Sequence, residues 1–320
     1  MLKSILISIF ASTMSNSFKG YMLGVLAAAS YGTNPLFALP LLNAGIEASS
    51  VLFIRYMLAI PMLVIIMLVR GRSFGLKKNQ WVPLITLGML MAASSLLLYV
   101  SYTYIGSAIA STLLFVYPII VTIIMALFYH EKVSMITIAS IMLAIAGISM
   151  LYRGGDGQTL SLVGLLMVGG SALSYAIYLV FVNMPKLKTV STLKITLYVI
   201  IFGTLLYALN FDINSLSVLN NSAWLWADAL AMAFFPTAFS LICTSAAIQK
   251  IGSTPVAILG AFEPVSAVFF AVTIFSEPMT LRLVVGILFI IVSVTLIISA
   301  GSVVNLLMRV RKMFPRKKRL

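Results

Sequence analysis

The sequence predicts an all-α integral membrane protein, with ten transmembrane helices arranged as two inverted five-helix repeats around a central cavity. Three observations predict this fold: the composition, ten apolar stretches and an internal repeat. Of the 320 residues, 62% are hydrophobic and only 9% are charged, whereas a soluble domain carries about 25% charged residues. So few charges cannot cover a water-facing surface, and the chain therefore belongs in a lipid bilayer.

Ten stretches are long and apolar enough to cross the hydrocarbon core, which takes about 20 helical residues at a rise of 1.5 Å each. We expect these helices at 20–42, 48–69, 81–101, 107–129, 134–152, 161–183, 192–209, 223–246, 254–275 and 282–305. Ser134 and Thr280 are predicted to cap the fifth and tenth helices. Glu131 and Glu277 precede these caps, near the positive ends of the same helix dipoles.

The 21 lysines and arginines predict the orientation. If the N-terminus is cytoplasmic, 18 of them lie in inner segments, Arg153 and Arg282 lie outside, and Arg55 lies within a span. This distribution follows the positive-inside rule, so we expect a cell (inner) membrane protein with both termini in the cytoplasm. The basic tail, 306–320, is expected to contact anionic lipid headgroups rather than nucleic acid.

The first nineteen residues are a separate question. Residues 1–19 hold an apolar run that is too short to span a membrane. We expect an uncleaved N-terminal interfacial extension. The alternatives are a signal peptide, or a start of translation at Met14 or Met22.

The internal repeat joins Tyr102–Glu131 to Ile248–Glu277 without a gap, at a constant offset of 146 positions from Tyr102 to Ile248. Its matched pairs are Gly106 and Gly252, Ser107 and Ser253, Pro118 and Pro264, and Glu131 and Glu277. Farther upstream Gly20 matches Gly164 at an offset of 144, and Ser30-Tyr31 matches Ser174-Tyr175. The repeats divide the chain into 20–153 and 154–305. Because each half holds an odd number of spans, the second half enters from the opposite side, and such repeats place the substrate site near the midplane.

One repeat position differs in chemistry, because Tyr117 of the first copy is Glu263 in the second. Glu263 is predicted about nine residues into its helix, roughly 14 Å deep. A charge at that depth costs at least about 2.5–3.5 kcal/mol, so Glu263 should face a water-filled cavity, pair or be protonated. It either contacts the substrate or carries a proton, or it is a protonated structural residue bonded across helices.

Two prolines and one arginine complete the unusual residues at depth. Pro118 and Pro264 leave the carbonyls of Leu114 and Gly260 without helical partners, so they are either hinges or static kinks. For Arg55 the sequence favours snorkelling to the outer headgroups beside Glu47. The alternative is an anchor for a substrate carboxylate or for Glu263.

The predicted substrate site joins polar and aromatic side chains from several helices. These residues are Glu263, Tyr117, Tyr31, Asn34, Tyr99, Tyr178, Thr237 and Phe239. An aromatic cavity with few charges suits small amphipathic or zwitterionic organic solutes. With one histidine and one cysteine, no zinc or haem site is expected, and no cofactor is predicted.

At these residues the chain resembles the EamA-like branch of the drug/metabolite transporter superfamily. In that family each five-helix repeat ends in a proline-containing apolar segment that leads to a glutamate and a further helix. The corresponding segments here are Tyr117-Pro118 to Glu131 and Glu263-Pro264 to Glu277. A glycine often precedes that glutamate in the family, where this chain has His130 and Ser276. The resemblance implies a ten-helix carrier in which helices one, three, four, six, eight and nine line the cavity.

The predicted function is a secondary transporter that moves small metabolites such as amino acids, outward and by alternating access. No enzymatic activity is predicted, because the spans offer only Glu263 and Arg55 at depth, and no nucleotide-binding loop is present. The alternatives are an importer or an antiporter, for example of a nucleotide-sugar. A scaffold or sensor without transport is a further alternative, and a packed, dry centre would favour it.

Overall fold

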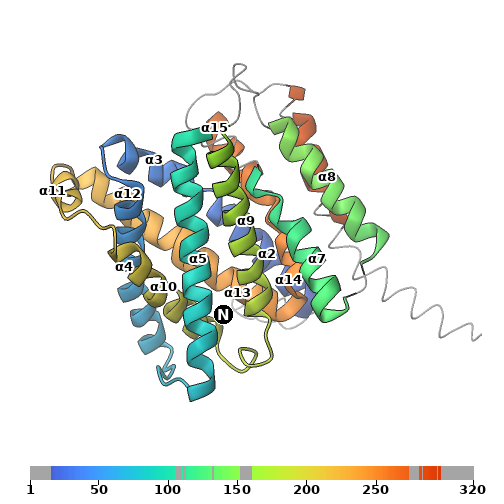
Figure 1. Cartoon of the computed structure of the whole chain (residues 1–320), viewed down its shortest axis with the longest axis horizontal. Coiled ribbons are helices and arrows are strands. Elements are labelled where there is room, and N and C mark those ends of the chain that lie inside the picture. The colour runs from blue at the N-terminus through green and yellow to red at the C-terminus, as the bar shows by residue number, and fades with distance from the viewer. Residues whose placement is uncertain are drawn as a thin grey trace, which may run out of the picture.

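The structure, a computed structural model, describes residues 16–105, 110, 113–131, 133–151, 161–273, 281–282, 284–293 and 295–296. Within these residues the chain forms helices and no strand (Figure 1). Several predicted features fall outside them. These are most of the N-terminal extension, the basic tail, Gly106, Ser107, Glu277 and Thr280.

Five helices in the described part are long and apolar enough to cross a membrane. They are Asn16–Asn43, Ala48–Val69, Lys78–Ile105, Leu162–Val182 and Ala223–Ile251. Shorter apolar helices of 10–17 residues add to them, among them α7 (Tyr117–Tyr129), α8 (Met135–Leu151), α10 (Thr192–Ala208) and Val284–Ser293. The prediction of an all-α membrane protein is therefore confirmed.

Predicted and observed helix ends agree closely where polar residues bound an apolar run. The second predicted span coincides with α4 (Ala48–Val69), which begins after Glu47 and ends before Arg70. The sixth span, α9 (Leu162–Val182), begins at Ser161, whose hydroxyl accepts from the Gly164 N–H at 3.5 Å. The third, α5 (Lys78–Ile105), extends beyond both predicted ends.

Four predicted spans are interrupted rather than continuous, and in the fourth span a turn at Phe115 and Val116 precedes α7. The first divides into α2 (Asn16–Tyr31) and α3 (Asn34–Asn43). The eighth consists of α12 (Ala223–Ala233), the π-helix η1 (Phe234–Phe239) and α13 (Ser240–Ile251). The ninth divides into α14 (Ser253–Leu259) and α15 (Phe262–Thr273). Hydropathy alone does not register these breaks, because the apolar composition continues across them.

The loops contain one confirmed cap and two unpredicted features. The Ser134 hydroxyl accepts from the Thr137 N–H at 3.0 Å at the start of α8, as predicted. A short helix, α11 (Asn214–Asn220), lies in the segment predicted as a loop. His130 ends α7 in the left-handed region at φ 53°, where glycine is favoured because it has no Cβ. The frequent family glycine at this position therefore has a backbone reason.

The two halves of the chain pack together through two equivalent helix pairs, α5 with α9 and α2 with α13. In the first pair the Ser171 hydroxyl donates to the Ser94 carbonyl at 2.7 Å. In the second pair the Ser240 hydroxyl donates to the Ala27 carbonyl at 3.0 Å. The offset of 146 maps Ser94 onto Ser240, and the offset of 144 maps Ala27 onto Ser171. Each contact thus has a counterpart with the two halves exchanged.

Two glycines make a second pair of exchanged contacts. A Cβ added at Gly20 would lie 2.5 Å from a methyl carbon of Ile251, and one added at Gly164 would lie 2.6 Å from the corresponding carbon of Ile105. Ile105 maps onto Ile251 at the offset of 146. The glycines therefore let helix backbones approach closely, as small residues do at membrane helix contacts.

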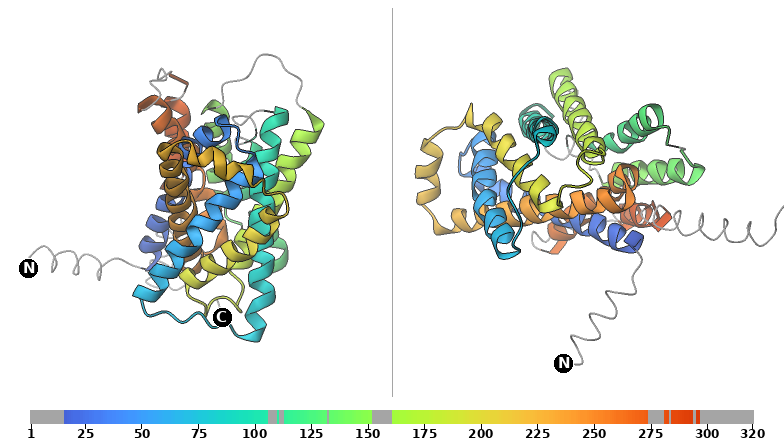
Figure 2. Two further views of the ribbon diagram at one scale, coloured as in Figure 1. Left: turned by 90° about the vertical axis from the view of Figure 1, so that its left-hand side faces the viewer. Right: turned by 90° about the horizontal axis from the view of Figure 1, so that it is seen from below.

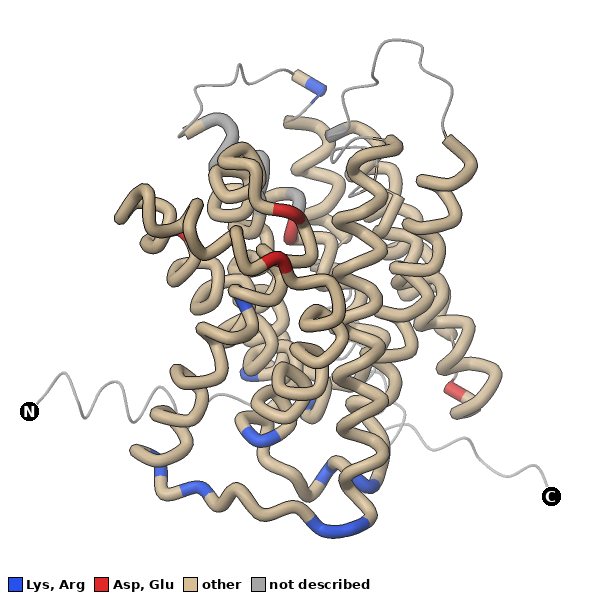
Figure 3. Tube along the Cα trace, turned by 60° about the vertical axis from the view of Figure 1, so that its left-hand side comes forward, with Lys and Arg blue, Asp and Glu red and all other residues tan. Residues whose placement is uncertain are grey.

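The helices spread from α11 and α12 at one edge of the molecule to α7 and α8 at the opposite edge (Figures 1 and 2). Lysines and arginines gather at the end that holds the loop between α4 and α5, whereas most of the drawn acidic residues lie in the other half (Figure 3).

Candidate functional site

The helix breaks at Gly32, in η1 and before α15 adjoin one another around α2. A Cβ added at Gly32, between α2 and α3, would lie 2.5 Å from the backbone carbonyl oxygen of Glu263 and 2.8 Å from the Ser266 Cβ. Gly32 is thus in close contact with the first turns of α15. The π-helix η1 contacts α2 and α4, and the Ser30 hydroxyl donates to the Phe235 carbonyl at 2.7 Å. Broken helices of this kind place polar backbone groups at membrane depth in transporters.

Glu263 lies in the first turn of α15, not in the middle of a continuous helix. The prediction of nine residues of preceding helix is wrong, because α14 ends at Leu259 and a turn at Gly260 and Ala261 follows. The Gly260 carbonyl accepts from the Glu263 N–H at 2.9 Å. The positive end of a helix stabilises a carboxylate in its first turn, so the break lowers the cost of a negative charge at this depth.

Tyr117 and Glu263, which occupy equivalent positions in the two repeats, lie at one cavity. Tyr117, the first residue of α7, and Glu263 both line it, together with Tyr31, Tyr175, Ser240 and Thr244. The Tyr117 hydroxyl lies against Gly260, where an added Cβ would overlap it. Its ring packs edge-on to Tyr175 at a centroid distance of 4.9 Å. The cavity is small, about 20 Å³, which is enough for about one water molecule.

Arg55 lies beside this cavity and is 1% exposed. Its guanidinium donates to the Thr237 hydroxyl, to the Asn34 side-chain oxygen at 3.2 Å and to the Pro236 carbonyl at 3.1 Å. The predicted snorkelling toward Glu47 is therefore wrong, because Arg55 finds its acceptors inside the helix bundle. All three acceptors are neutral, so they satisfy N–H groups without balancing the positive charge.

Tyr31 contacts Arg55 and also lines the cavity. The Arg55 guanidinium carbon lies 5.8 Å from the centroid of the Tyr31 ring and 5.9 Å from that of Tyr56. Both distances are within the range of cation–π attraction. Tyr31 also lines the cavity that Glu263 lines. The buried cation and the half-buried acid are therefore neighbours of the same aromatic ring.

Pro236 lies in the π-helix that supplies two of the three acceptors of Arg55. A proline has no N–H, so it leaves the carbonyl of Met232, four residues earlier, without its helical donor. The Thr237 hydroxyl donates to that carbonyl at 2.8 Å and accepts from Arg55. The Pro236 carbonyl, within η1, accepts from Arg55 as well. Such π-bulges are frequent at functional sites.

Of the predicted site residues, six gather in two adjoining groups. Glu263, Tyr117 and Tyr31 line the cavity. Asn34, Tyr99 and Thr237 surround Arg55, with the Asn34 amide donating to the Tyr99 hydroxyl at 2.9 Å.

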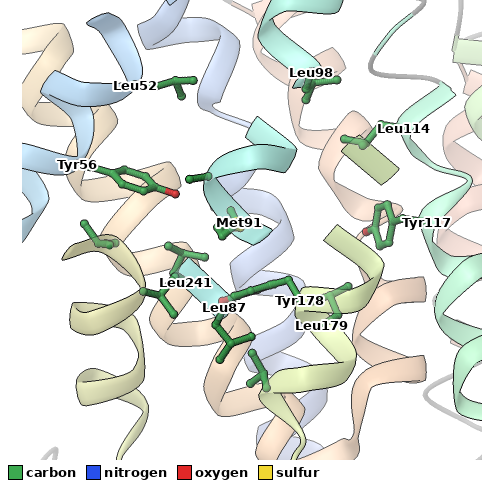
Figure 4. Packing of buried hydrophobic residues seen from close by; sticks show 14 of the residues in the cluster. Leu52, Tyr56, Leu87, Met91, Leu98, Leu114, Tyr117, Tyr178, Leu179 and Leu241 are labelled. Atoms are coloured by element: carbon green, nitrogen blue, oxygen red, sulfur yellow. The ribbon is translucent and has the colours of Figure 1, made fainter. Parts of the chain in front are cut away.

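The other predicted residues lie elsewhere. Tyr178 is fully buried and extends into the leucine cluster (Figure 4), although its ring stacks at 6.0 Å on Tyr175. Phe239 is 36% exposed and stacks with Phe234 at 6.4 Å. Pro118 lies in the first turn of α7. Pro264 lies in the first turn of α15, and its side chain is outside the described part.

The predicted site did not include Tyr175, Ser240 and Thr244, which also line the cavity. The repeat contains a signal for the first of them, because Tyr175 is the counterpart of Tyr31 at the offset of 144. Ser240 is the counterpart of Ser94. The position of Thr244 on α13 has no comparable sequence signal.

This arrangement provides a hydrogen-bonded cation over the Tyr31 ring and, at the cavity that Tyr31 lines, an acid at a helix N-terminus. The first can bind a carboxylate in the fork geometry of a guanidinium. The second can bind an amine or exchange a proton. The described residues contain no group of three or more His, Cys, Asp or Glu side chains that could hold a metal ion.

Comparison with known proteins agrees with this architecture. The chain is 23% identical over 258 residues to the uncharacterized transporter YvbV of Bacillus subtilis, and the alignment covers 81% of this chain and 82% of that protein. It is 25% identical over 302 residues to an uncharacterized transporter of Clostridium kluyveri, and this alignment covers 90% of this chain and 93% of that protein. A crystal structure that is 15% identical in sequence has the same fold, with a TM-score of 0.74 over 87% of this chain and 95% of the other.

The sequence model of the EamA-like transporter family matches residues 18–153 and 162–299, which together form almost all of the chain. These two matched segments correspond to the two repeats of the sequence, 20–153 and 154–305, which contain the broken helices. The chain belongs to the EamA-like transporter family.

Proposed function

We propose that this protein is a secondary transporter that moves small zwitterionic solutes, such as amino acids, outward across the cell membrane by alternating access. The observation that carries this proposal is that Arg55 lies over the Tyr31 ring, while Tyr31 and Glu263 line one cavity next to the helix breaks. A zwitterion carries the two complementary charges.

Arg55 would bind the carboxylate of the solute. Its present acceptors on Thr237, Asn34 and Pro236 are neutral, and a buried charge without a counterion is destabilising by about 3–5 kcal/mol when its partner is absent. A guanidinium has five N–H groups, so the fork can take on a carboxylate while it keeps part of its present network. Binding would therefore compensate a charge that the empty protein leaves unbalanced.

Glu263 and the tyrosines around it would bind the ammonium group. The carboxyl group of Glu263 shares its cavity with Tyr31, Tyr117 and Tyr175. An ammonium over a tyrosine ring gains cation–π attraction of about 2 kcal/mol or more in a site without water. The same carboxyl group would carry the coupling proton if transport is driven by protons, so Glu263 can serve both of the functional roles predicted from the sequence.

The cavity must open for this function. Its volume of about 20 Å³ is far below the roughly 300 Å³ of a small-molecule site, and a closed centre by itself favours the scaffold alternative. Membership of a transporter family supports transport instead, and the structure would then correspond to an occluded state. The backbone would bend at the breaks at Gly32, at Val116 and at Gly260. Pro118 and Pro264 lie in the first helix turns after the second and third of these breaks. A small solute would enter when one set of half-helices moves away from the other.

We further propose that ten spans form two inverted repeats, with both termini in the cytoplasm. The exchanged contacts of Gly20 with Ile251 and of Gly164 with Ile105 support a twofold relation between the halves. The lysines and arginines at one end of the molecule support the orientation. Because the two contacts are equivalent, Gly20→Ala and Gly164→Ala should destabilise the protein by similar amounts, about 1–3 kcal/mol each. Thermal unfolding in detergent that differs strongly between the two would argue against equivalence.

The transport test uses protein in liposomes and counterflow of radiolabelled amino acids, tried one at a time. We expect at least one amino acid to exchange, and Arg55→Gln and Glu263→Gln each to abolish the exchange. Arg282→Gln and Glu47→Gln are matched controls, because both residues are exposed. Exchange of nucleotide-sugars in place of amino acids would support the antiporter alternative. Normal amino-acid exchange by both Gln variants would remove these residues from the mechanism.

A further inference from the structure

A basic cavity lies at the end of the molecule where lysines and arginines gather. It has a volume of about 340 Å³ and is far larger than the cavity beside Glu263. Three cationic side chains line it, Arg72, Lys77 and Lys194, and none of its lining residues is acidic. The remaining lining residues are small or polar: Ser73, Gly75, Gln80, Thr189, Val190 and Ser191.

Two helices begin at this cavity. Lys77 and Gln80 belong to the start of α5, and Ser191 and Lys194 to the start of α10. These helices contact each other along their length. The positive ends of two helix dipoles, of 28 and 17 residues, therefore add to the three cations. A helix N-terminus is a favourable site for a phosphate or another anion.

Ser191 gives an independent sign of a missing ligand. It is the N-terminal cap residue of α10, yet its side chain makes no capping hydrogen bond. Its hydroxyl oxygen is buried and has no hydrogen-bond partner among the described residues. Since buried hydroxyl groups are normally hydrogen-bonded, an anion in the cavity would supply the missing acceptor.

The loop between α4 and α5 is held in place beside the cavity. The Lys194 ammonium donates to the Gly75 carbonyl at 2.8 Å and to the Ser73 hydroxyl at 3.2 Å. The Tyr198 hydroxyl donates to the Phe74 carbonyl at 2.7 Å. The cavity is thus a built site that joins the first half of the chain, through the loop, to the second half, through α10.

The level of the cavity points to the membrane surface. Trp81 follows the cavity residue Gln80 directly, is 45% exposed, and packs against Tyr198 at 6.2 Å. Exposed tryptophan and tyrosine beside lysine and arginine are typical of the level of the lipid headgroups. Basic pockets between spans on the cytoplasmic side bind anionic headgroups.

We propose that this cavity binds a phosphate group, supplied by the headgroup of an anionic phospholipid of the inner leaflet. Bound there, the phosphate would bridge Arg72 and Lys77 of the first half to Ser191 and Lys194 of the second half. It would therefore favour conformations in which the two halves are closed at this end. The choice of leaflet rests on the proposed orientation, but the phosphate chemistry does not.

The test measures thermal stability of the purified full chain in detergent with short-chain phosphatidylglycerol, with short-chain phosphatidylcholine, or with inorganic phosphate. The variant is Arg72→Gln with Lys77→Gln, which leaves the Lys194 bonds to the loop in place. The control is Lys188→Gln with Lys250→Gln, which removes the same charge from two exposed lysines outside the cavity lining. A second readout, native mass spectrometry, counts bound lipids and does not depend on stability.

We expect phosphatidylglycerol to raise the melting temperature of the wild type and of the control, and phosphatidylcholine to have little effect. Loss of two surface cations should weaken binding in the variant by roughly 30-fold. A response to inorganic phosphate in place of the lipid would keep the site and assign it to a soluble phosphate compound. Equal binding of phosphatidylglycerol by the variant and the control, or no binding by the wild type, would overturn the proposal.

Discussion

Thr237→Val is the substitution that tests the polar centre most specifically. It keeps the size and the β-branched shape of the side chain but removes the hydroxyl. That hydroxyl donates to the Met232 carbonyl and accepts from the Arg55 guanidinium. The variant therefore removes the hydroxyl bond to the Met232 carbonyl and the hydroxyl acceptor of a charged Arg55 N–H. Thr237 and Arg55 are both at most 1% exposed.

The expected loss of stability follows from these two bonds. A hydrogen bond to a charged group contributes about 1.5–3 kcal/mol, and a neutral side-chain bond within a membrane protein contributes on average about 0.6 kcal/mol. Thr237→Val should therefore lower the free energy of unfolding by about 2–4 kcal/mol. A hydroxyl that only folds back on its own helix should matter far less.

Thr204 provides the matched control. It is 7% exposed, and its hydroxyl donates only to the Ile200 carbonyl of its own helix, at 2.8 Å. Thr204→Val should cost less than about 1 kcal/mol, within the range of single hydrogen bonds in membrane proteins. The assay is unfolding by SDS titration in mixed micelles, followed by tryptophan fluorescence. Equal losses for the two variants would refute the bridging role of Thr237.

Two further predictions concern single backbone positions. Gly260→Ala should displace the Tyr117 hydroxyl and cost about 1–3 kcal/mol as overpacking, whereas Gly169→Ala, where an added Cβ meets nothing within 4 Å, should be neutral or stabilising; equal melting temperatures for the two would contradict the contact. His130→Gly should raise the free energy of unfolding by about 1 kcal/mol because φ is 53°, and His130→Val should lower it; the opposite order of melting temperatures would mean that His130 does not hold a left-handed conformation.

The fold was largely predictable because the signals that define it are local. Polar residues such as Glu47 and Arg70 mark the ends of apolar runs, and α4 begins and ends at those marks. The repeat was visible as matched glycines, and Gly20 and Gly164 make equivalent contacts. The helix breaks were missed because hydropathy stays high across Gly32, Pro236 and Gly260, although each of these residues is a local signal for a break.

The candidate site was predictable in part, and the direction of Arg55 was not. Its helix is apolar on all sides, so the sequence could not say whether the side chain points to lipid headgroups or inward. Two of the three acceptors that draw it inward come from a π-helix 181 residues or more away in sequence. Glu263 was identified as the key acid, but its place at a helix start depended on the turn at Gly260 and Ala261, which hydropathy does not mark.

In the proposed site, Arg55 binds the carboxylate and Glu263 binds the ammonium group of one solute. This assignment is tested most directly by competition in the liposome exchange assay, using the transported amino acid, its carboxamide and its deaminated acid against wild type, Arg55→Lys and Glu263→Gln. In the wild type both analogues should compete at least tenfold more weakly than the amino acid. Arg55→Lys, which keeps the charge but loses the guanidinium fork, should weaken the amino acid more than the carboxamide, and Glu263→Gln should weaken it more than the deaminated acid. Equal competition by all three compounds in the wild type would contradict the two-charge site.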